Sequence, residues 1–409
     1  MRTKKLLLSC LFFISSIIIL TGCLESIELN NLAVVAGIAI DKTDETYTLT
    51  AQMLNPSAIA GETGNALDVY SLKAEGRSIH EAYKKLDQLT SSALSLSHLD
   101  VIVINEDFAK AGISPLLNFA LRRDDIRPDI AIVVAKEKNA GDILNVVTAL
   151  DRIPASKIDI SSRVSSRTQR LTSYNLYEVV DMVNTNSINV VLNAVSIHHV
   201  EEHTDEDIER QDGTQGKTSR NGSTVDNMLD ITIPVQLRIE HLAIFKGDKL
   251  AGFINDAEAQ LYNMVMGDYK RYDIVTKIEA DYYTSFGVTE LKSKITTDLE
   301  KNEATIKMEI SGIVLENTYP VDFTNTENLV AMSVYLKDQF EKDINKFVNK
   351  VQTELKSDVF GIGGKAHNQE NKVWKEKEGY WSDIFPELTI NVEVELEISS
   401  VGEIGNVTL

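Results

Sequence analysis

Residues 101–135 read VIVINEDFAKAGISPLLNFALRRDDIRPDIAIVVA, and the fold class of the first half of the chain follows from them. Residues 101–104 and 130–135 are short apolar runs, whereas residues 114–123 place Leu116, Leu117, Ala120 and Leu121 on one helical face. Unbroken apolar strands joined by a crossover helix are typical of parallel strands that are covered on both faces. The pattern predicts a strand–helix–strand unit within a parallel sheet.

Toward the N-terminus, residues 32–40 and 47–54 predict two further strands joined by a turn at 41–44. Residues 55–67 are rich in Gly, Pro and Asn and predict a loop. Ser78 and Glu81 match a capping box, in which a hydroxyl and a carboxylate satisfy the free amides of a helix start. A helix is therefore predicted from this box to Leu89.

Toward the C-terminus, the same unit continues with a predicted helix at 140–150, a helix at 176–183 and a strand at 188–197, while 151–172 is polar and weakly patterned. These elements define an N-terminal α/β region over residues 23–199. The pattern leaves open whether this region is one unit or two subdomains, one formed by about 23–55 plus 150–199 and the other by 56–149.

Residues 200–230 interrupt the pattern of helices and strands. Between 201 and 230 there are nine acidic and three basic residues, and apolar residues are almost absent before Val225. Such a stretch cannot bury enough apolar surface to offset the entropy of ordering. We expect a mobile acidic loop here, with an acidic docking segment as the alternative.

Residues 231–409 predict a C-terminal α+β domain. Strands are expected at 231–239, 241–246 and 249–253, the last two joined by the hairpin signal Gly247-Asp248, and a helix at 256–266. From a second capping box at 324–327, apolar residues recur every three or four positions to Leu355 and predict a long amphipathic helix. Residues 307–315 predict a strand, as do 388–398, which alternate between apolar and polar residues. The expected fold is α+β (mixed α/β), with mixed and antiparallel sheets in more than one domain.

The long helix has two interpretations. Its apolar stripe can pack across a sheet, which we favour, or it can bind a partner as a coiled coil. The glycine-rich residues 360–364 are expected to end this helix.

The N-terminal residues 1–22 have the features of a secretory signal. Arg2, Lys4 and Lys5 precede an apolar segment at 6–20, which is shorter than the roughly 20 residues of a membrane span. Leu20-Thr21-Gly22-Cys23 then resembles the cleavage site of bacterial lipoproteins. In such proteins the cysteine carries an S-diacylglyceryl group and an N-acyl chain such as palmitate, and several acyl chains on one residue form a lasting anchor. We expect Cys23 to be lipidated, with an uncleaved anchor as the alternative.

The chain's composition limits its partners. A net charge of −20 over 409 residues repels phosphate backbones, so nucleic acid is excluded as an expected partner. Cys10, the other cysteine, lies in the predicted signal, so no disulfide is expected in the mature chain. The expected location is the outer face of a membrane.

Two motifs that are typical of zinc or dinucleotide sites are present, but the predicted secondary structure around each differs from what such a site needs. His199-Val200-Glu201-Glu202-His203 matches a zinc hydrolase pattern that works on a helix, yet His199 ends a predicted strand. The sequence 361–366 matches G-x-G-x-x-A, but it follows a predicted helix instead of a strand. Neither motif supports a metal site or a cofactor site, and we predict no enzyme.

Several stretches resemble one family in order along the chain. They are GCLESIELNNLAVVAGIAID at 22–41, GRS at 76–78, SHL at 97–99, AKAGI at 109–113, RRDDIR at 122–127, AIFKGDKLAG at 243–252 and DVFGIG at 358–363, together with Trp374 and Trp381. In these stretches the chain resembles the C-subunit lipoproteins of nutrient germinant receptors in spore-forming bacteria. It departs from them at Leu24-Glu25, where the family usually has Trp-Asp, and in the long acidic insertion.

The resemblance implies a non-catalytic subunit without a cofactor, which is lipid-anchored on the outer face of the spore's inner membrane. It also implies two partners, an integral membrane A subunit and a B subunit that resembles amino-acid transporters. Candidate contact residues are Leu24 and Glu25 within 24–31, and Trp374 and Trp381 within an aromatic group that includes Tyr380 and Phe385. The alternative for these aromatics is ordinary core. The alternative function is a solute-binding lipoprotein that captures a nutrient directly.

Overall fold

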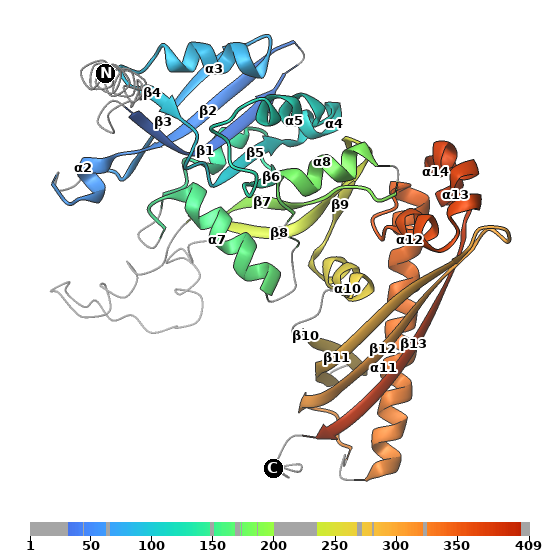
Figure 1. The fold of residues 1–409 in the computed structure, drawn as a ribbon. Coiled ribbons are helices and arrows are strands. Elements are labelled where there is room, and N and C mark those ends of the chain that lie inside the picture. Colours follow the sequence, from blue (N-terminus) through green and yellow to red (C-terminus); the bar gives the residue numbers. More distant parts are fainter. Residues whose placement is uncertain are drawn as a thin grey trace, which may run out of the picture.

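The structure is a computed structural model that describes residues 32–43, 45–62, 66–147, 151–167, 172, 174–185, 187–199, 235–267, 272–279, 282–321 and 325–401. A large sheet with helices on both faces lies beside a smaller sheet that carries one long helix along its length (Figure 1). The predicted α+β fold with mixed and antiparallel sheets and a long C-terminal helix is therefore confirmed.

The large sheet has the strand order β3-β2-β1-β5-β6-β7-β8-β9, and β4 also pairs with β1. Its strands are β1 (Leu32–Lys42), β2 (Tyr47–Leu54), β3 (Val69–Gly76), β4 (Ala93–Ser95), β5 (Val101–Asn105), β6 (Ala131–Ala135), β7 (Val191–His199), β8 (Val235–Lys246) and β9 (Lys249–Ile254). The central strands β1, β5, β6 and β7 are parallel, which confirms the predicted parallel pair. The antiparallel hairpins β2–β3 and β8–β9 flank them.

Helices cover this sheet on two sides because successive side chains of its central strands point to opposite faces. Ile102 and Ile104 pack in a core with α3 (Ile79–Asp87), α4 (Glu106–Ala111), α5 (Ser114–Leu121) and α8 (Leu176–Asn184). Val101 and Val103 pack in a second core with α6 (Ala140–Ile143) and α7 (Pro154–Arg167). The unbroken apolar runs in the sequence thus reflect burial on both faces.

Two predicted elements differ from the structure in this region. The helix expected at 140–150 is the single turn α6, and the weakly patterned stretch after it contains α7. The α7 helix buries Ala155, Ile158 and Ser162, a narrow stripe with two small residues, so its apolar pattern is weak. A short helix α2 (Pro56–Ile59) lies within the predicted loop.

The large sheet continues across residue 231, where the sequence predicts the start of the C-terminal domain. β8 pairs with β7, and β9 pairs with β8. The two strands predicted at 231–239 and 241–246 form one strand with a bulge, at which His241 has a φ of 71°. Hydrogen bonding therefore joins 235–254 to the N-terminal region.

The small sheet has the order β10-β11-β12-β13 and packs against α11. Its strands are β10 (Tyr272–Glu279), β11 (Tyr282–Asp298), β12 (Glu303–Asn317) and β13 (Thr389–Val401), and α10 (Asp256–Met266) precedes them. The long helix α11 (Thr326–Asn349) continues as a π-helix at Lys350–Leu355. It buries Met332, Leu336, Phe340, Ile344 and Phe347, so its stripe packs on the sheet as the favoured interpretation predicts.

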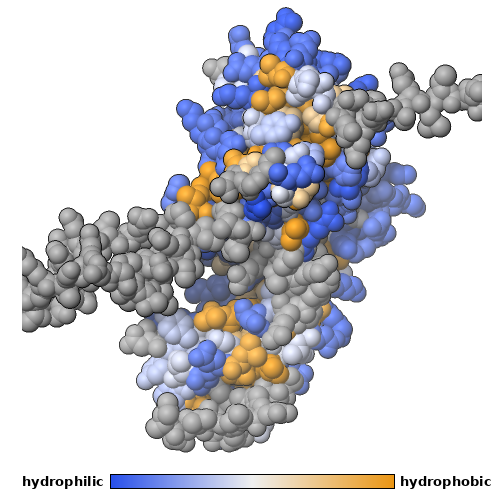
Figure 2. Space-filling model, turned by 90° about the vertical axis from the view of Figure 1, so that its left-hand side faces the viewer, coloured by the Kyte–Doolittle hydropathy of each residue, from blue (hydrophilic) through white to orange (hydrophobic). Residues whose placement is uncertain are grey.

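Most of the coloured side chains on the face drawn in Figure 2 are hydrophilic, and hydrophobic side chains form separate patches in its upper and lower parts. Among the described residues, no helix is both long and apolar enough to cross a membrane.

Candidate functional site

The sequence-predicted contact residues fall into two groups. Cys23, Leu24 and Glu25 lie outside the described residues, as does the predicted acidic loop 200–230. Trp374 and Trp381 are each only 3% exposed, within α13 (Asn371–Lys377) and α14 (Trp381–Ile384). Tyr380 is the exposed member of this aromatic group, at 68%. The two indoles thus pack inside the chain, and their contact with a partner stays a prediction.

A buried carboxylate, that of Asp358, is bonded to one member of this aromatic group, Trp381. Its Oδ1 accepts a hydrogen bond from the Ile362 amide at 3.0 Å, and its Oδ2 accepts one from the Gly363 amide at 2.8 Å and one from Trp381 Nε1 at 2.9 Å. Burial raises the pKa of Asp358 to about 6, although these hydrogen bonds oppose the shift. Asp358 therefore joins two helices around a charge that water does not reach.

The glycine-rich stretch beside Asp358 forms part of this packing. The π-helical segment ends at Leu355, with Lys356 as its C-cap, and the glycines open α12 (Ile362–Gln369), so the prediction that they end the long helix is wrong. A Cβ on Gly363 would lie 2.7 Å from both indole rings, which stack edge to face with centroids 5.1 Å apart. The amides that a phosphate would need at the start of α12 already bond Asp358.

The segment around Asp358 also links the small sheet to the large one. The Asn189 amide, just before β7, donates to the Asp358 carbonyl at 2.8 Å. The Ser357 hydroxyl donates to the Phe245 carbonyl on β8, and the Gly364 amide donates to the Ser187 carbonyl at 2.9 Å. Displacement of α12 would therefore disturb β8 and the residues that precede β7.

A second set of hydrogen bonds joins two stretches that are far apart in sequence, the start of α5 and the β8–β9 turn. The Ile113 amide donates to the Asp248 carbonyl at 2.8 Å, and the Ser114 hydroxyl donates to Asp248 Oδ2 at 2.6 Å. Gly112 has a φ of 120°, and a Cβ there would lie 2.7 Å from the same carboxylate. The β8–β9 turn is thus fastened to the start of α5 in a way that requires a glycine.

A cleft of about 490 Å³ lies between the start of α3 and one side of α5. Tyr47, Ile79 and Phe119 supply apolar lining. Its basic side chains are those of Arg77, Arg122 and Arg123, and the imidazole of His80 also lines it. In a chain of net charge −20 this grouping of cations is unusual, and it brings the stretches 76–78 and 122–127 together in space.

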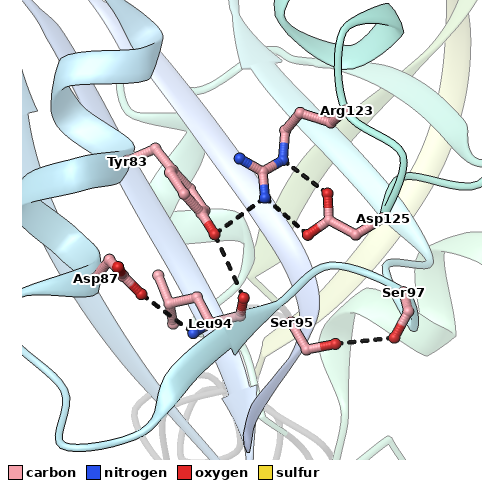
Figure 3. Close-up of polar contacts among 7 residues, drawn as sticks. All are labelled: Tyr83, Asp87, Leu94, Ser95, Ser97, Arg123 and Asp125. Atoms are coloured by element: carbon pink, nitrogen blue, oxygen red, sulfur yellow. Dashed lines mark hydrogen bonds and ion pairs between the residues drawn. The ribbon is translucent and has the colours of Figure 1, made fainter. Parts of the chain in front are cut away.

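Arg123 holds one wall of this cleft together (Figure 3). Its Nε and Nη2 donate to the two carboxylate oxygens of Asp125 at 2.8 and 2.7 Å, and Nη2 also donates to the Tyr83 hydroxyl at 3.1 Å. The guanidinium lies 4.2 Å from the centre of the Tyr83 ring. Burial raises the pKa of Tyr83, so its hydroxyl stays protonated and donates to the Leu94 carbonyl at 3.3 Å. Arg123 is therefore a structural residue.

The remaining cations of the cleft are more available. Arg77 is paired with Glu81 at 3.0 Å, and hydrogen bonds from Arg77 lower the pKa of Glu81 to about 2. Arg122 is exposed and forms no ion pair with any described residue. Sequence reasoning did not single out this cleft, although two arginine-containing stretches in an acidic chain were a signal for it. The arrangement can bind a negatively charged group beside an apolar one.

The described residues give little support to the two chemical motifs. His199 ends strand β7, and the other residues of the zinc pattern lie outside the described part. Among described residues, no three His, Cys, Asp or Glu side chains are grouped to hold a metal ion.

Comparison with known proteins identifies the family. Residues 25–197 match the family described as "Spore germination protein N-terminal domain", and residues 240–402 match "Spore germination B3/ GerAC like, C-terminal". The chain is 27% identical over 418 residues to spore germination protein KC of Bacillus subtilis (strain 168), covering 98% of this chain and 96% of that protein. It is 22% identical over 406 residues to spore germination protein B3 of the same organism, covering 97% and 98%.

A solved structure shares the fold. The crystal structure of the GerBC protein matches with a TM-score of 0.51 and 18% identity, covering 89% of this chain and 97% of that chain. Because both halves match in order and nearly full-length relatives carry the same description, the chain belongs to the GerAC-like family of spore germination proteins, the C-subunit family of germinant receptors.

Proposed function

We propose that this chain is the lipoprotein C subunit of a nutrient germinant receptor and that it is required, together with integral membrane A and B subunits, to trigger spore germination. The observation that carries the proposal is the match of both halves of the chain, in order, to the two GerAC-like domains. Within this proposal the chain has no catalytic step, and its contribution is assembly.

The proposed location is the outer face of the cell membrane and, in the spore, of the inner membrane. The sequence at 20–23 supports a lipid anchor on Cys23. Such an anchor holds the folded part beside its partners, and this raises the effective concentration of each contact, so individual contacts can be weak. The subunit can shift its partners between closed and open states only by contacting the two states with different affinity.

The cleft between α3 and α5 is the contact surface that we favour. Its cations suit an acidic group on a partner, and its apolar lining suits an adjacent hydrophobic side chain. The solute-binding alternative is less favoured, because a hinged pair of similar lobes would be expected, whereas the two sheets here differ in strand order.

The first test is affinity capture of the full-length protein from detergent-solubilised spore membranes, followed by mass spectrometry. We expect two multi-span proteins to accompany the wild type and to be reduced with Cys23→Ala. Recovery of the wild type alone and intact would contradict the assembly proposal.

The cleft is tested with Arg122→Glu, because this exposed side chain has no ion pair among the described residues. We expect reversed charge to lower recovery of the partners about tenfold, the effect of about 1.4 kcal/mol in binding free energy. Lys342→Glu, an exposed charge reversal on α11, is the matched control and should leave recovery unchanged. Equal recovery with both variants would remove the cleft from the proposal but leave the assembly proposal standing.

A further inference from the structure

A second cavity, separate from the cleft, lies where strands β6 and β7 diverge. The two strands pair only at Val133–Asn193, Val134–Ala194 and Ala135–Val195, and before these pairs Asn175 bridges to Ala131 instead. Helix α7 covers the gap. The cavity has a volume of about 170 Å³, which is several times the space of one water molecule.

Two hydroxyl groups in the wall of this cavity form no hydrogen bond with the described part of the chain. Ser162 is 2% exposed and Thr172 is 8% exposed, and both line the cavity. Neither Ser162 Oγ nor Thr172 Oγ1 has a hydrogen-bond partner among the residues that the structure describes. Buried polar groups normally find a partner, because leaving one unpaired costs about 1–3 kcal/mol. The two hydroxyls therefore point to a polar occupant.

The charges around the cavity favour a cationic occupant. Asp129 and Asp159 line it, and Arg163, whose Nε donates to Asp159 at 2.9 Å, is the cation that lines it. The Asp159 side chain is 14% exposed, whereas that of Arg163 is 51% exposed, so the acceptor lies deeper than the cation. Burial raises the pKa of Asp159, and the nearby carboxylates Asp100 and Asp129 raise it further, although hydrogen bonding to Arg163 opposes the shift. A positive charge in the cavity would relieve this crowding of negative charge.

From the cavity, its two unpartnered hydroxyls and its carboxylates, we infer that it binds a small molecule with a primary ammonium group. An ammonium ion has three N–H donors, and the lining of the cavity offers three acceptors, Ser162 Oγ, Thr172 Oγ1 and the Asp159 carboxylate. The same chemistry is offered by a simple amine and by an α-amino acid. An amino acid would add a carboxylate, which suits the more exposed Arg163. The inference does not depend on the proposed assembly with A and B subunits.

The test is equilibrium dialysis of the purified full-length protein in detergent against labelled glycine and labelled methylammonium, with acetate and glycerol as competitors. We expect saturable binding of at least one ammonium compound below about 10 mM, the range in which a ligand of few atoms binds. Glycine binding tighter than methylammonium would identify an amino-acid site, and equal binding would identify an amine site. Acetate and glycerol should not compete.

Variants locate the site. Ser162→Ala and Thr172→Val each remove one hydroxyl and should weaken binding about fivefold, the typical net value of one hydrogen bond, and Asp159→Asn should weaken it by more than about tenfold. Ser161→Ala, the neighbouring serine on α7 that does not line the cavity, is the control and should bind as the wild type does.

Three results would overturn the inference. One is the absence of saturable binding, which would mean that the cavity holds water only. Another is competition by glycerol as strong as by the ammonium compounds, and the third is unchanged binding in all the cavity variants. Capture of the A and B subunits should be normal with each cavity variant, so failure here is distinguishable from failure of the assembly proposal.

Discussion

At the scale of single residues, Asp358 connects three separate parts of the fold. Its side chain accepts hydrogen bonds from the start of α12 and from Trp381, and its backbone carbonyl accepts one from the Asn189 amide, just before β7. A buried carboxylate is costly unless donors surround it, and here three donors do so. The residue therefore fixes the position of α12 and α14 relative to the large sheet.

Trp381→Phe should destabilise the protein because it removes the Nε1 donor to Asp358 and part of a buried ring. We expect the free energy of unfolding to fall by about 2–4 kcal/mol, the sum of a hydrogen bond to a charged group and lost packing. Urea denaturation, followed by far-ultraviolet circular dichroism, measures the change in the free energy of unfolding. Tyr380→Phe is the adjacent control and should stay within about 0.5 kcal/mol, since Tyr380 is 68% exposed.

Asp358 should also make stability depend on pH. Burial raises its pKa to about 6 in the folded state, against about 3.9 in an unfolded chain. The folded state thus holds the proton more tightly. The stabilisation that Asp358 gains from this tighter proton binding is complete below about pH 4, declines as the pH rises to about 6, and is lost above that.

We therefore expect the wild type to lose roughly 3 kcal/mol of stability relative to Asp358→Asn between pH 4 and pH 7. The measurement is the difference in unfolding free energy between the two proteins at several pH values. A difference that stays constant over this range would show that Asp358 does not titrate there.

At the scale of elements, α11 derives its place from its apolar stripe. Phe340 is 4% exposed and contacts Phe286 on β11 with ring centroids 6.3 Å apart. Phe340→Ala should lower the free energy of unfolding by about 3–5 kcal/mol, the usual cost of removing a buried aromatic ring. Val334→Ala, on the exposed side of the same helix at 53%, should have no cost, because alanine is the better helix former. Thermal or urea unfolding of both variants tests this, and similar losses would mean that the helix does not pack by one face.

Elements with an undisturbed pattern could be predicted from the sequence. The strands around 101–104 and 130–135 were predictable because burial on both faces demands continuous apolar runs. Strand β13 was predictable because one face is buried and the other is wet, so alternation is complete. The α11 stripe persists over the whole helix, which makes its period clear.

Other elements could not be predicted, and the structure gives the reasons. Strand β11 has register shifts at 285–286 and 288–290, and each shift moves the alternation onto the other face, so no single period fits. The narrow stripe of α7 contains a buried serine. The cleft and the Asp358 cluster join residues far apart in sequence, and these contacts arise from topology that periodicity does not encode.

At the scale of the whole molecule, the central question is where the chain can be divided. The sequence pattern divides it at 231, after the acidic stretch. Strand β7 is buried at Val191, Leu192 and Val195, and the edge of β7 that faces away from β6 is paired with β8. A chain that ends at 230 would lose β8 and β9 and would expose this apolar edge, which is a template for aggregation.

We therefore predict that residues 23–230 expressed alone aggregate, whereas residues 23–254, which retain β8 and β9, give a folded monomer. Size-exclusion chromatography and cooperative thermal unfolding by circular dichroism distinguish the two outcomes. The two fragments differ by β8, β9 and the residues before them, and both lack the Asp358 contacts, so this loss cannot explain a difference. A monomeric, cooperatively unfolding 23–230 would instead mean that the β7 edge is tolerated and that the N-terminal region is complete before residue 231.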